Sequence, residues 1–377
     1  MQLYAHQIRA INEATRRVLI AHSVGCGKTA TAIGIAKRNK GKTLVVCPKG
    51  LRLNWPKELS MWEYTADVVT KEEFKKTSKE LKKYDNLIID ESHWFFGKSA
   101  MNKALSVYLK KHDPNLILLT GTPKTSQDYW PIYRAALLLG HKWEYLKFRD
   151  LYYKQQYFGQ RCLWVRKEGM EARAEESIRK IASVVSLNDC ADVPEQQEIV
   201  IETGETKEQL RLKSEVLDIA QIARFTAEHK IECAGNKMES LLRFAEENKK
   251  IMIVTRYRDN LKYIVETLRK EKYNVYEIHG DVITEDRQKV IDSVEIVDEC
   301  IVVATAGTCE GYSLSSIPVM IFVSMDFSYK AFVQMKARIQ RINALKKNIY
   351  IYLIGGACDK KIYDSMMKQK DFDPLSC

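Results

Sequence analysis

A short glycine-containing loop is the first feature of the sequence that could do chemistry. The stretch VLIAHSVGCGKT passes from an apolar run through Gly25 and Gly27 to Lys28 and Thr29. Glycines let backbone N–H groups close around phosphate oxygens, a helix starting after them adds positive partial charge, and a lysine reaches the terminal phosphates. The Thr29 hydroxyl is a ligand for Mg²⁺. We expect a phosphate and Mg²⁺ site here, although His22 replaces the first glycine of G-x-x-x-x-G-K-T. The alternative is a helix that merely begins with Gly-Lys-Thr.

An acidic pair further along the chain would complete a site that hydrolyses a nucleotide. Asp90 and Glu91 end an apolar run in the sequence LIIDESH. We expect Asp90 to hold Mg²⁺ and its waters, and Glu91 to orient and deprotonate the attacking water. His93 has either a coupling role or a structural one. In the later sequence LLTGTP, the hydroxyls of Thr120 and Thr122 either sense the state of the phosphate or simply form a turn.

Strands and helices must position these groups. Short continuous apolar runs in residues 1–140 are typical of parallel strands buried on both faces, and helix-like segments separate them. The pattern returns after residue 248, whereas 141–235 is richer in aromatic, charged and helix-like sequence. We therefore expect an α/β protein with two parallel-sheet lobes joined through a helical middle segment. The expected strands are 18–21, 43–47, 86–89, 116–119, 250–255, 275–278, 300–305, 319–324 and 350–354, and the expected helices are 29–38, 98–111, 171–185, 206–225 and 260–270.

Length and composition set the domain organisation. The 377 residues are 45% hydrophobic and 29% charged, which excludes a disordered or low-complexity chain and suffices for two domains. We expect a first lobe in 1–190, with a helical extension from about 141, and a second lobe in 191–377, with its core in about 236–377. The apolar runs are too short to span a membrane. The nine cysteines are scattered without the spacing of a local zinc site.

The charge is unevenly distributed. Residues 1–140 hold 23 Lys and Arg against 12 Asp and Glu, so they carry the whole net charge of +11. A basic surface on one lobe suits a polyanion such as nucleic acid. The equally weighted alternative is a solvated lysine surface that keeps the protein soluble.

In motif order, the first half resembles the superfamily 2 helicase-like ATPases, specifically their Swi/Snf-related branch. The opening LYAHQ is similar to the segment that recognises adenine, which implies Gln7 as the base-contacting residue. SVGCGKT is similar to motif I, although the family usually has acidic residues where His22 and Ser23 stand. LLTGTP is similar to motif III. DESH is the motif II variant of annealing-helicase members. LVVCPKGLRLNW resembles motif Ia, which implies that Pro48 and Lys49 lie near the tracked strand. Because carboxyl ends of parallel strands form the binding crevice, we expect Lys49 and Arg52 to contact the nucleic-acid backbone.

The second half resembles the same branch. IHGD followed by Arg287 is similar to the family's "G…R" element, and ATAGTCEGYSL is similar to motif V, which implies a nucleotide-site role for Gly311. QMKARIQRI is similar to motif VI, which implies a coupling role for Gln334 and arginine fingers at Arg338 and Arg341. On a helix, a spacing of three places both guanidinium groups on one face, from which they can stabilise charge on a γ-phosphate.

The resemblance implies a motor that hydrolyses ATP with Mg²⁺ between two RecA-like lobes. Its expected partner is duplex or branched DNA, bound without sequence preference, rather than RNA. The alternatives are an RNA-directed or strand-separating helicase, and a nucleotide-dependent DNA clamp with incidental ATP hydrolysis. No histone-reading or DNA-targeting domain is visible, so we expect a nearly bare motor. The N-terminus lacks a signal-peptide core, and we expect action inside a cell without a membrane partner, in the cytoplasm or nucleoid of a bacterial or virus-infected cell rather than in a eukaryotic nucleus.

Overall fold

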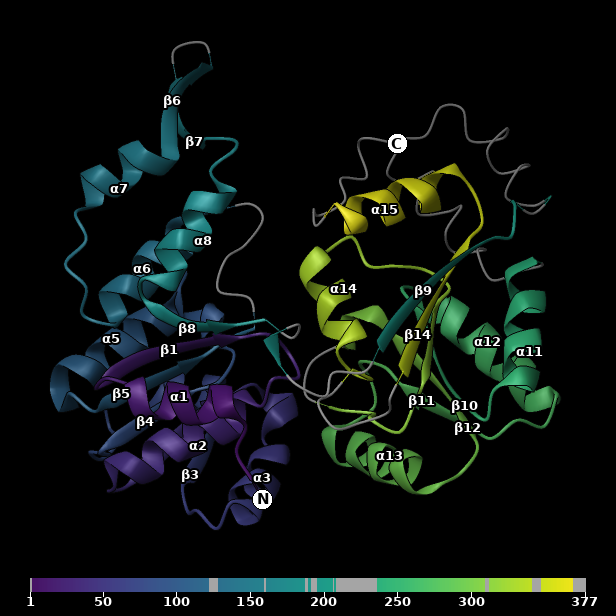
Figure 1. Cartoon of the computed structure of the whole chain (residues 1–377), viewed down its shortest axis with the longest axis horizontal. Helices are drawn as coiled ribbons and strands as arrows, with labels where there is room; N and C mark the ends of the chain where they lie inside the picture. The colour runs from purple at the N-terminus through teal and green to yellow at the C-terminus, as the bar shows by residue number, and fades with distance from the viewer. Residues whose placement is uncertain are drawn as a thin grey trace. The chain divides into compact units, whose positions relative to one another are not determined.

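The chain folds into two compact units, Met1–Cys190 and Ala191–Cys377 (Figure 1). The computed structural model describes residues 2–121, 128–158, 161–186, 189–190, 195–205, 207, 236–308, 312–340 and 347–368. Each unit is built on a six-stranded parallel sheet, and each is described separately below. Within the described ranges, no helix combines the length and apolar character needed to cross a bilayer.

The sheet of unit 1 has the strand order β3-β2-β4-β5-β1-β8, and every neighbouring pair is parallel. Its central strands are continuous apolar runs because both of their faces are covered. Leu19 and Ile20, neighbours in β1, accordingly belong to different buried clusters on opposite faces of the sheet. The strands are β1 (Arg17–His22), β2 (Thr43–Cys47), β3 (Asp67–Thr70), β4 (Asn86–Ile89), β5 (Asn115–Leu119) and β8 (Ala182–Val185).

Helices cover both faces of this sheet. Ile33 of α2 packs in the cluster that contains Ile20, and Tyr108 of α5 packs in the cluster that contains Leu19. The two clusters bury the sheet and fix the positions of the strand ends. The helices are α1 (Ala5–Glu13), α2 (Lys28–Asn39), α3 (Asn54–Met61), α4 (Lys71–Thr77), α5 (Ala100–His112), α6 (Trp130–Leu138), α7 (Tyr145–Tyr152) and α8 (Glu171–Arg179), with the 3₁₀ turns η1 (Lys49–Leu51) and η2 (Ser92–Phe95).

The middle segment is not simply helical, which corrects our expectation. Helices α7 and α8 are present, but β6 (Tyr153–Phe158) and β7 (Arg161–Arg166) form an antiparallel hairpin between them. The end of the expected helix 171–185 is strand β8, whose Ala182 pairs with Leu19 of β1. Beyond β1 the sheet would otherwise end in unpaired backbone groups, and β8 satisfies them. The expected helix 206–225 lies almost wholly outside the described residues.

The sheet of unit 2 has the order β11-β12-β10-β13-β14-β9, again with parallel neighbours. Met252 and Ile253, neighbours in β10, belong to separate buried clusters, so this sheet is also covered on both faces. Its elements are β9 (Glu195–Glu202), α11 (Asn236–Glu247), β10 (Lys250–Thr255), α12 (Arg258–Lys270), β11 (Val275–Ile278), α13 (Thr284–Ile296), β12 (Cys300–Thr305), η4 (Ala306–Thr308), β13 (Val319–Phe322), α14 (Tyr329–Lys336), β14 (Lys347–Ile354) and α15 (Ala357–Met367).

Strand β9 extends the second unit beyond the core that we expected from about residue 236. Its eight residues pair in parallel with β14, from Glu195 opposite Lys347 to Glu202 opposite Ile354. β9 alternates exposed and half-buried side chains toward its end because it lies at the sheet edge. The core of unit 2 therefore includes a strand from the segment that we expected to be helical.

Candidate functional site

Four loops of unit 1 leave the carboxyl edge of its sheet. The strand order places β2, β4, β5 and β1 side by side. Residues 48–52 follow β2, the acidic pair follows β4, residues 120–121 follow β5, and the glycine loop follows β1. Carboxyl ends of adjacent parallel strands form the usual ligand-binding edge of an open α/β sheet. The candidate residues of unit 1 are thus gathered at one edge, in an order that the sequence did not specify.

The glycine loop is shaped by two glycines with left-handed backbones. The φ angles are 92° at Gly25 and 69° at Gly27, a region that disfavours other residues. Gln7 Nε2 donates a hydrogen bond of 3.1 Å to the Gly27 carbonyl, and its Oε1 accepts one of 2.8 Å from Tyr4 N. A Cβ at Gly27 would lie only 2.2 Å from Gln7 Nε2. Buried Gln7 therefore braces the loop from α1.

Lys28, the first residue of α2, folds back over the loop. Its Nζ donates to the carbonyls of His22 and Ser23, at 3.0 Å and 3.2 Å. The loop after β5 lies against the same group, because a Cβ at Gly121 would be 3.3 Å from Lys28 Nζ and 2.9 Å from Val24 Cγ2. The structure thus brings the segments resembling motifs I and III into contact.

Two hydroxyl residues of these segments are described and a third is not. Thr29 is the second residue of α2 and is half-buried. Thr120 is buried, and its backbone N–H donates to the Ile20 carbonyl at 3.1 Å, which fixes the exit of β5 beside β1. Thr122, expected to couple phosphate state to movement, lies outside the described residues.

The acidic pair is held by a residue that the sequence did not single out. Trp55 of α3 donates from Nε1 to Asp90 Oδ2 at 3.0 Å. Glu91 has a left-handed backbone, with φ of 48°, and its Oε2 lies 3.1 Å from His93 Nδ1. A non-glycine residue in this conformation is uncommon, and such strain concentrates at functional sites. The only sequence signal for Trp55 was its place at the end of the segment resembling motif Ia.

The electrostatics of Asp90 suit a cation ligand. Burial and then the neighbouring Glu91 carboxylate raise the pKa of Asp90 to about 7, while the Trp55 hydrogen bond and the Lys28 charge oppose that rise. A hydroxyl from Thr29 and a carboxylate from Asp90 are the hard oxygen ligands that Mg²⁺ takes. Among the described residues, no group of three or more His, Cys, Asp or Glu side chains could hold a metal by itself. Mg²⁺ fits this setting because it commonly uses one or two protein oxygens together with substrate phosphates.

The loop is also tied to the end of unit 1. His22 is fully buried, and its Nε2 lies 3.0 Å from Ser183 Oγ of β8. Burial, followed by the charges of nearby basic groups, lowers the pKa of His22 to about 3. Cys190 Sγ lies 3.5 Å from Cys26 Sγ of the glycine loop and 3.9 Å from His6 Nδ1. These contacts join residues more than 150 positions apart, so local sequence contained no signal for them.

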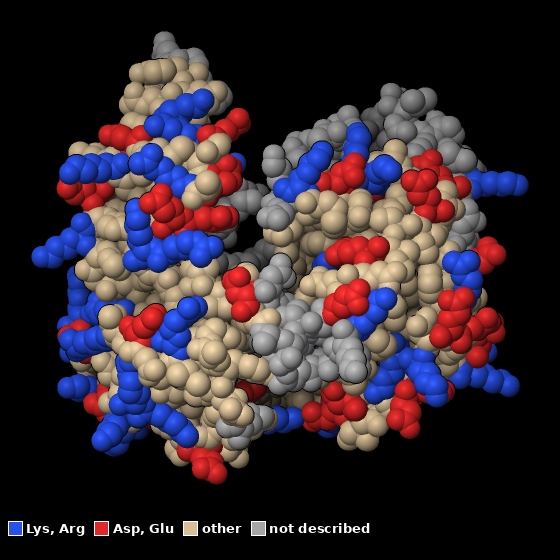
Figure 2. Space-filling model, in the orientation of Figure 1, with Lys and Arg blue, Asp and Glu red and all other residues tan. Residues whose placement is uncertain are grey.

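The loop after β2 presents cations at the same edge. Pro48 is buried, whereas Lys49, the first residue of the short turn η1, and Arg52, which follows that turn, are exposed. Arg52 pairs with Glu73 of α4, so part of its charge is already compensated. Figure 2 shows Lys and Arg side chains spread over the visible face of unit 1, with carboxylates interspersed.

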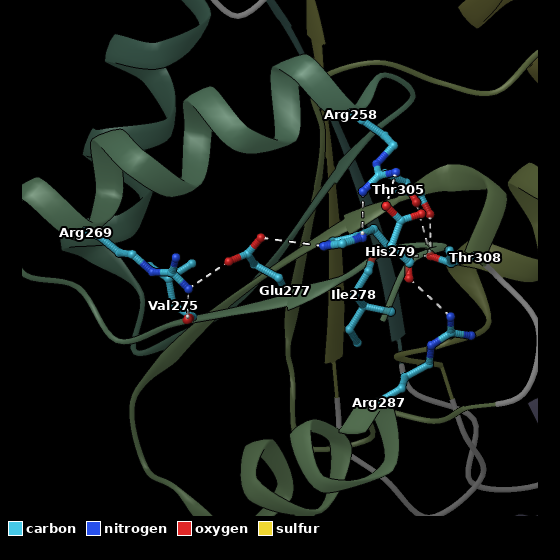
Figure 3. A network of polar contacts seen from close by, with 10 residues as sticks. Arg258, Arg269, Val275, Glu277, Ile278, His279, Arg287, Thr305 and Thr308 are labelled. Atoms are coloured by element: carbon cyan, nitrogen blue, oxygen red, sulfur yellow. Dashed lines mark hydrogen bonds and ion pairs between the residues drawn. The ribbon is translucent and has the colours of Figure 1, made fainter. Parts of the chain in front are cut away.

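In unit 2, the segment resembling the "G…R" element is fixed by two arginines (Figure 3). Arg258 of α12 donates to His279 Nδ1 at 3.3 Å and lies 2.5 Å from Asp281 Oδ2. Arg287 of α13 donates to the His279 carbonyl at 3.2 Å. The turn after β11 is therefore held from both flanking helices.

The next strand end joins the same network. Thr308 Oγ1 donates to the Thr305 carbonyl at 2.7 Å and lies 3.3 Å from the Ile278 carbonyl (Figure 3). The start of the segment resembling motif V is thereby connected to the end of β11. Gly311, in the same segment, lies outside the described residues.

The segment resembling motif VI differs from the expected helix. α14 ends at Lys336, so Arg338 lies in the turn that follows. The expectation that Arg338 shares one helix face with Arg341 is therefore wrong, because Arg338 is not in a helix. Arg338 is 7% exposed, donates from Nε to the Gln334 carbonyl at 2.8 Å, and donates from Nη1 to the Tyr312 carbonyl. The helix ends there because these side-chain bonds occupy the last turn. Gln334 is buried, and Arg341 lies outside the described residues.

Comparisons with known proteins agree with this arrangement. The family model described as "Helicase conserved C-terminal domain" matches residues 236–343. The "SWI/SNF-related matrix-associated actin-dependent regulator of chromatin subfamily A-like protein 1 homolog" of Caenorhabditis elegans is 24% identical over 95% of this chain and 59% of its own length. The "DNA annealing helicase and endonuclease ZRANB3" of Bos taurus is 27% identical over 39% of this chain and 17% of its own length. The Pyrococcus furiosus Hef helicase domain shares the fold, with a TM-score of 0.59, 14% identity, and coverage of 97% of this chain and 98% of that domain.

The chain thus has two parallel-sheet α/β units, with a glycine loop and an acidic pair at one sheet edge of unit 1, and its second unit contains the match to the helicase C-terminal family model. Over nearly its whole length the chain is similar to SWI/SNF-related proteins of animals, with 24% identity to two of them. It spans about half the length of the curated relatives it matches: 59%, 42% and 52% of three of them.

One expectation is overturned by these relatives. We expected a bacterial or virus-infected cell rather than a eukaryotic nucleus. The proteins matched over nearly the whole chain come from a nematode, a frog and a fly, and each is named as a regulator of chromatin. That finding contradicts the expectation, which was wrong.

Proposed function

We propose that this chain couples ATP hydrolysis to movement along, or remodelling of, duplex or branched DNA. The observation that carries the proposal is the convergence of the glycine loop, Lys28 and the Asp90–Glu91 pair at adjacent strand ends of unit 1. Lys28 is close enough to Asp90 to influence its pKa. A phosphate-binding cation beside a carboxylate pair is the arrangement that phosphoryl transfer to water requires.

Each residue at this edge has a separate chemical task in the proposal. Gly25, Gly27 and the N-terminus of α2 bind phosphate oxygens, and Lys28 exchanges its two loop carbonyls for those oxygens. Gln7 contacts the adenine while it braces the loop. Mg²⁺, held by Thr29 and Asp90, neutralises phosphate charge. Glu91 accepts the proton of the attacking water, and its contact with His93 keeps the carboxylate in place.

The second unit supplies positive charge and coupling. Arg338 and Arg341 act as arginine fingers on the γ-phosphate of ATP bound to unit 1. Arg338 then has to exchange its bonds to the carbonyls of Tyr312 and Gln334 for phosphate oxygens, which couples the phosphate to the turn after α14. Gly311 contributes to the nucleotide site. The residues that couple the phosphate to movement are His93, Thr120, Thr122 and Gln334.

DNA is the proposed polyanion for two reasons. Lys49 and Arg52 are exposed at the carboxyl edge of the sheet of unit 1, next to buried Pro48. They belong to residues 1–140, which carry the whole net charge of +11. One relative, ZRANB3, is named as a DNA annealing helicase, which supports branched DNA as the structure acted on. RNA is the second candidate, because the "ATP-dependent RNA helicase DBP3" of Yarrowia lipolytica is 24% identical over 28% of this chain and 20% of its own length.

A panel of ATPase assays tests the proposal. Turnover is measured without nucleic acid and with blunt duplex, forked duplex, single-stranded DNA and RNA of matched length. Strong stimulation by duplex or forked DNA, abolished by Glu91→Gln, is the expected result. Stimulation by RNA alone favours the second candidate. Binding of DNA without any stimulation indicates a nucleotide-dependent clamp and contradicts the motor.

A further inference from the structure

A hairpin of unit 1 has no role in the function proposed above. Strands β6 and β7 extend beyond α7 and α8, away from the sheet of the same unit (Figure 1). The sequence of the hairpin, YKQQYFGQRCLWVR, contains three cations and no acidic residue. A projecting basic element on a protein proposed to act on DNA is placed to meet a polyanion.

One face of the hairpin carries exposed aromatic side chains. In the antiparallel register, Gln155 pairs with Trp164 and Tyr157 pairs with Cys162, so these four residues share a face. Tyr157 is 69% exposed and Trp164 is 39% exposed. Two exposed rings on one face give this projecting hairpin an apolar surface that can contact a ligand.

Cations lie on the other face of the hairpin and beside Trp164. Lys154 and Arg161 are exposed and belong to the opposite face of the two-stranded ribbon. Arg149 of α7 stacks on Trp164, with its guanidinium carbon 3.9 Å from the ring centroid. The Trp164 ring is therefore held in place on one side by a cation, as a stacking platform requires.

The base of the hairpin is anchored firmly. Tyr153 Oη accepts hydrogen bonds from the backbone N–H groups of Tyr129 and Trp130, at 2.9 Å and 3.0 Å, and donates to Asp128. The Trp130 and Tyr153 rings stack at 5.0 Å with an interplanar angle of 17°. Lys167 N donates to the Tyr152 carbonyl at 2.9 Å, directly after β7. The exposed aromatics thus project from a rigid support, so little ordering entropy opposes binding to them.

We propose that this hairpin binds the unpaired bases of a single-stranded polynucleotide, which stack on Tyr157 and Trp164 while the positive charge of the hairpin attracts the phosphates. Stacking on aromatic rings with flanking cations is the sequence-tolerant mode by which proteins bind single strands. Paired bases are unavailable for stacking, so the site distinguishes a single strand or an open fork from a closed duplex. The inference rests on the proposed function, because it assigns the unpaired region of a branched substrate to the hairpin.

The test measures binding without ATP, so its outcome is independent of hydrolysis. Fluorescence anisotropy is recorded with single-stranded oligo-dT, oligo-U and blunt duplex DNA for the full chain. Tyr157→Ala and Trp164→Ala should each weaken single-strand binding by about 5- to 100-fold, with little change for duplex. Trp164→Phe should retain most of the affinity, because it keeps a stacking ring. Tyr263→Ala, which removes an exposed tyrosine of α12 in unit 2, is the matched control and should change nothing.

A second readout keeps the test decisive. Stacked bases quench indole fluorescence, so oligo-dT should quench the wild-type protein more than Trp164→Phe. The aromatic variants should unfold at the wild-type temperature, since both side chains are exposed. An equal loss for single strands and duplex, or no loss in the Tyr157→Ala, Trp164→Ala double variant, overturns the proposal. Selective loss for oligo-dT or oligo-U supports it and identifies the polynucleotide. If the ATPase panel shows no stimulation while this selective loss appears, the motor fails and the binding site stands.

Discussion

Trp55 and Asp90 are joined by a hydrogen bond of 3.0 Å from the indole Nε1 to the carboxylate Oδ2. Trp55 is 2% exposed and lies in α3, and Asp90 directly follows β4, so the bond connects the helix after the basic loop to the candidate Mg²⁺ ligand. The indole occupies one lone-pair direction of Oδ2 and orients the carboxylate.

Loss of this bond should lower the affinity for Mg²⁺ more than it lowers the stability of the fold. Trp55→Phe keeps a buried ring but removes the donor. Because groups that orient metal ligands are typically worth 10- to 100-fold in metal affinity, we expect the Mg²⁺ concentration for half-maximal ATPase to rise by about 10-fold. Trp62→Phe, a nearby change in the same core cluster, is the control. An unchanged Mg²⁺ titration would show that Asp90 is oriented without the indole.

Glu91→Gln separates hydrolysis from binding. The amide has the shape of the carboxylate but cannot accept the proton of water, so turnover should fall by about 10²–10⁴-fold while ATP binding persists. Lys28→Ala should instead weaken ATP binding, because it removes the phosphate contact. Both effects are read from steady-state ATPase rates and from titration with a fluorescent ATP analogue. Wild-type turnover in Glu91→Gln would remove Glu91 from the mechanism.

Arg338 should affect both turnover and stability. As an arginine finger it is worth about 10³–10⁵-fold in turnover, and Arg338→Ala should leave most of the ATP affinity intact. The change also leaves the Tyr312 carbonyl without its buried donor, which costs about 1–3 kcal/mol of unfolding free energy. Arg269→Ala removes an exposed arginine of the same unit and serves as control. Reduced stability with normal turnover would assign Arg338 to structure alone.

Lys49→Ala tests the DNA contact. If Lys49 neutralises one phosphate, the slope of log affinity against log salt on duplex DNA should fall by about 0.9, equally for all sequences. ATPase without DNA should hardly change. Lys110→Ala, an exposed lysine in the last turn of α5, gives the comparison because α5 ends near the opposite edge of the sheet. Equal slopes for wild type and Lys49→Ala would make the basic edge a solvated surface.

His22 should make the protein sensitive to acid. The folded-state pKa of His22, about 3, lies below its ordinary value of 6.5. Between these two pH values the unfolded chain binds a proton at this residue and the folded chain does not. Stability from this residue is therefore complete above pH 6.5 and is lost as the pH falls toward 3. Between pH 7 and pH 5 the loss is about 2 kcal/mol. Urea unfolding at both values should show a smaller drop for His22→Gln, and identical drops would show that His22 is not the group responsible.

Much of the fold could be predicted from the sequence because buried parallel strands consist of continuous apolar runs. The expected strands 43–47, 86–89, 250–255, 275–278 and 300–305 have the bounds of β2, β4, β10, β11 and β12. The strands that escaped prediction are short or lie at sheet edges. β8 continues a helix-like sequence, and β9 has exposed polar residues along much of its length. They form strands because a neighbouring strand, β1 or β14, has unpaired backbone groups on that side, and not because of their own sequence pattern.

The types of the candidate site residues were also determined by the sequence alone, since Gly-x-Gly-Lys-Thr and Asp-Glu each follow an apolar run. Tertiary structure decided which groups hold them. The Trp55 bond to Asp90, the Ser183 contact of His22 and the Cys26–Cys190 contact join segments 35, 161 and 164 residues apart. It also decided that Arg338 lies beyond the end of α14, where its guanidinium donates to the carbonyls of Gln334 and Tyr312. Local patterns report burial and periodicity, whereas long-range partners depend on strand order, which arises only when the sheet assembles.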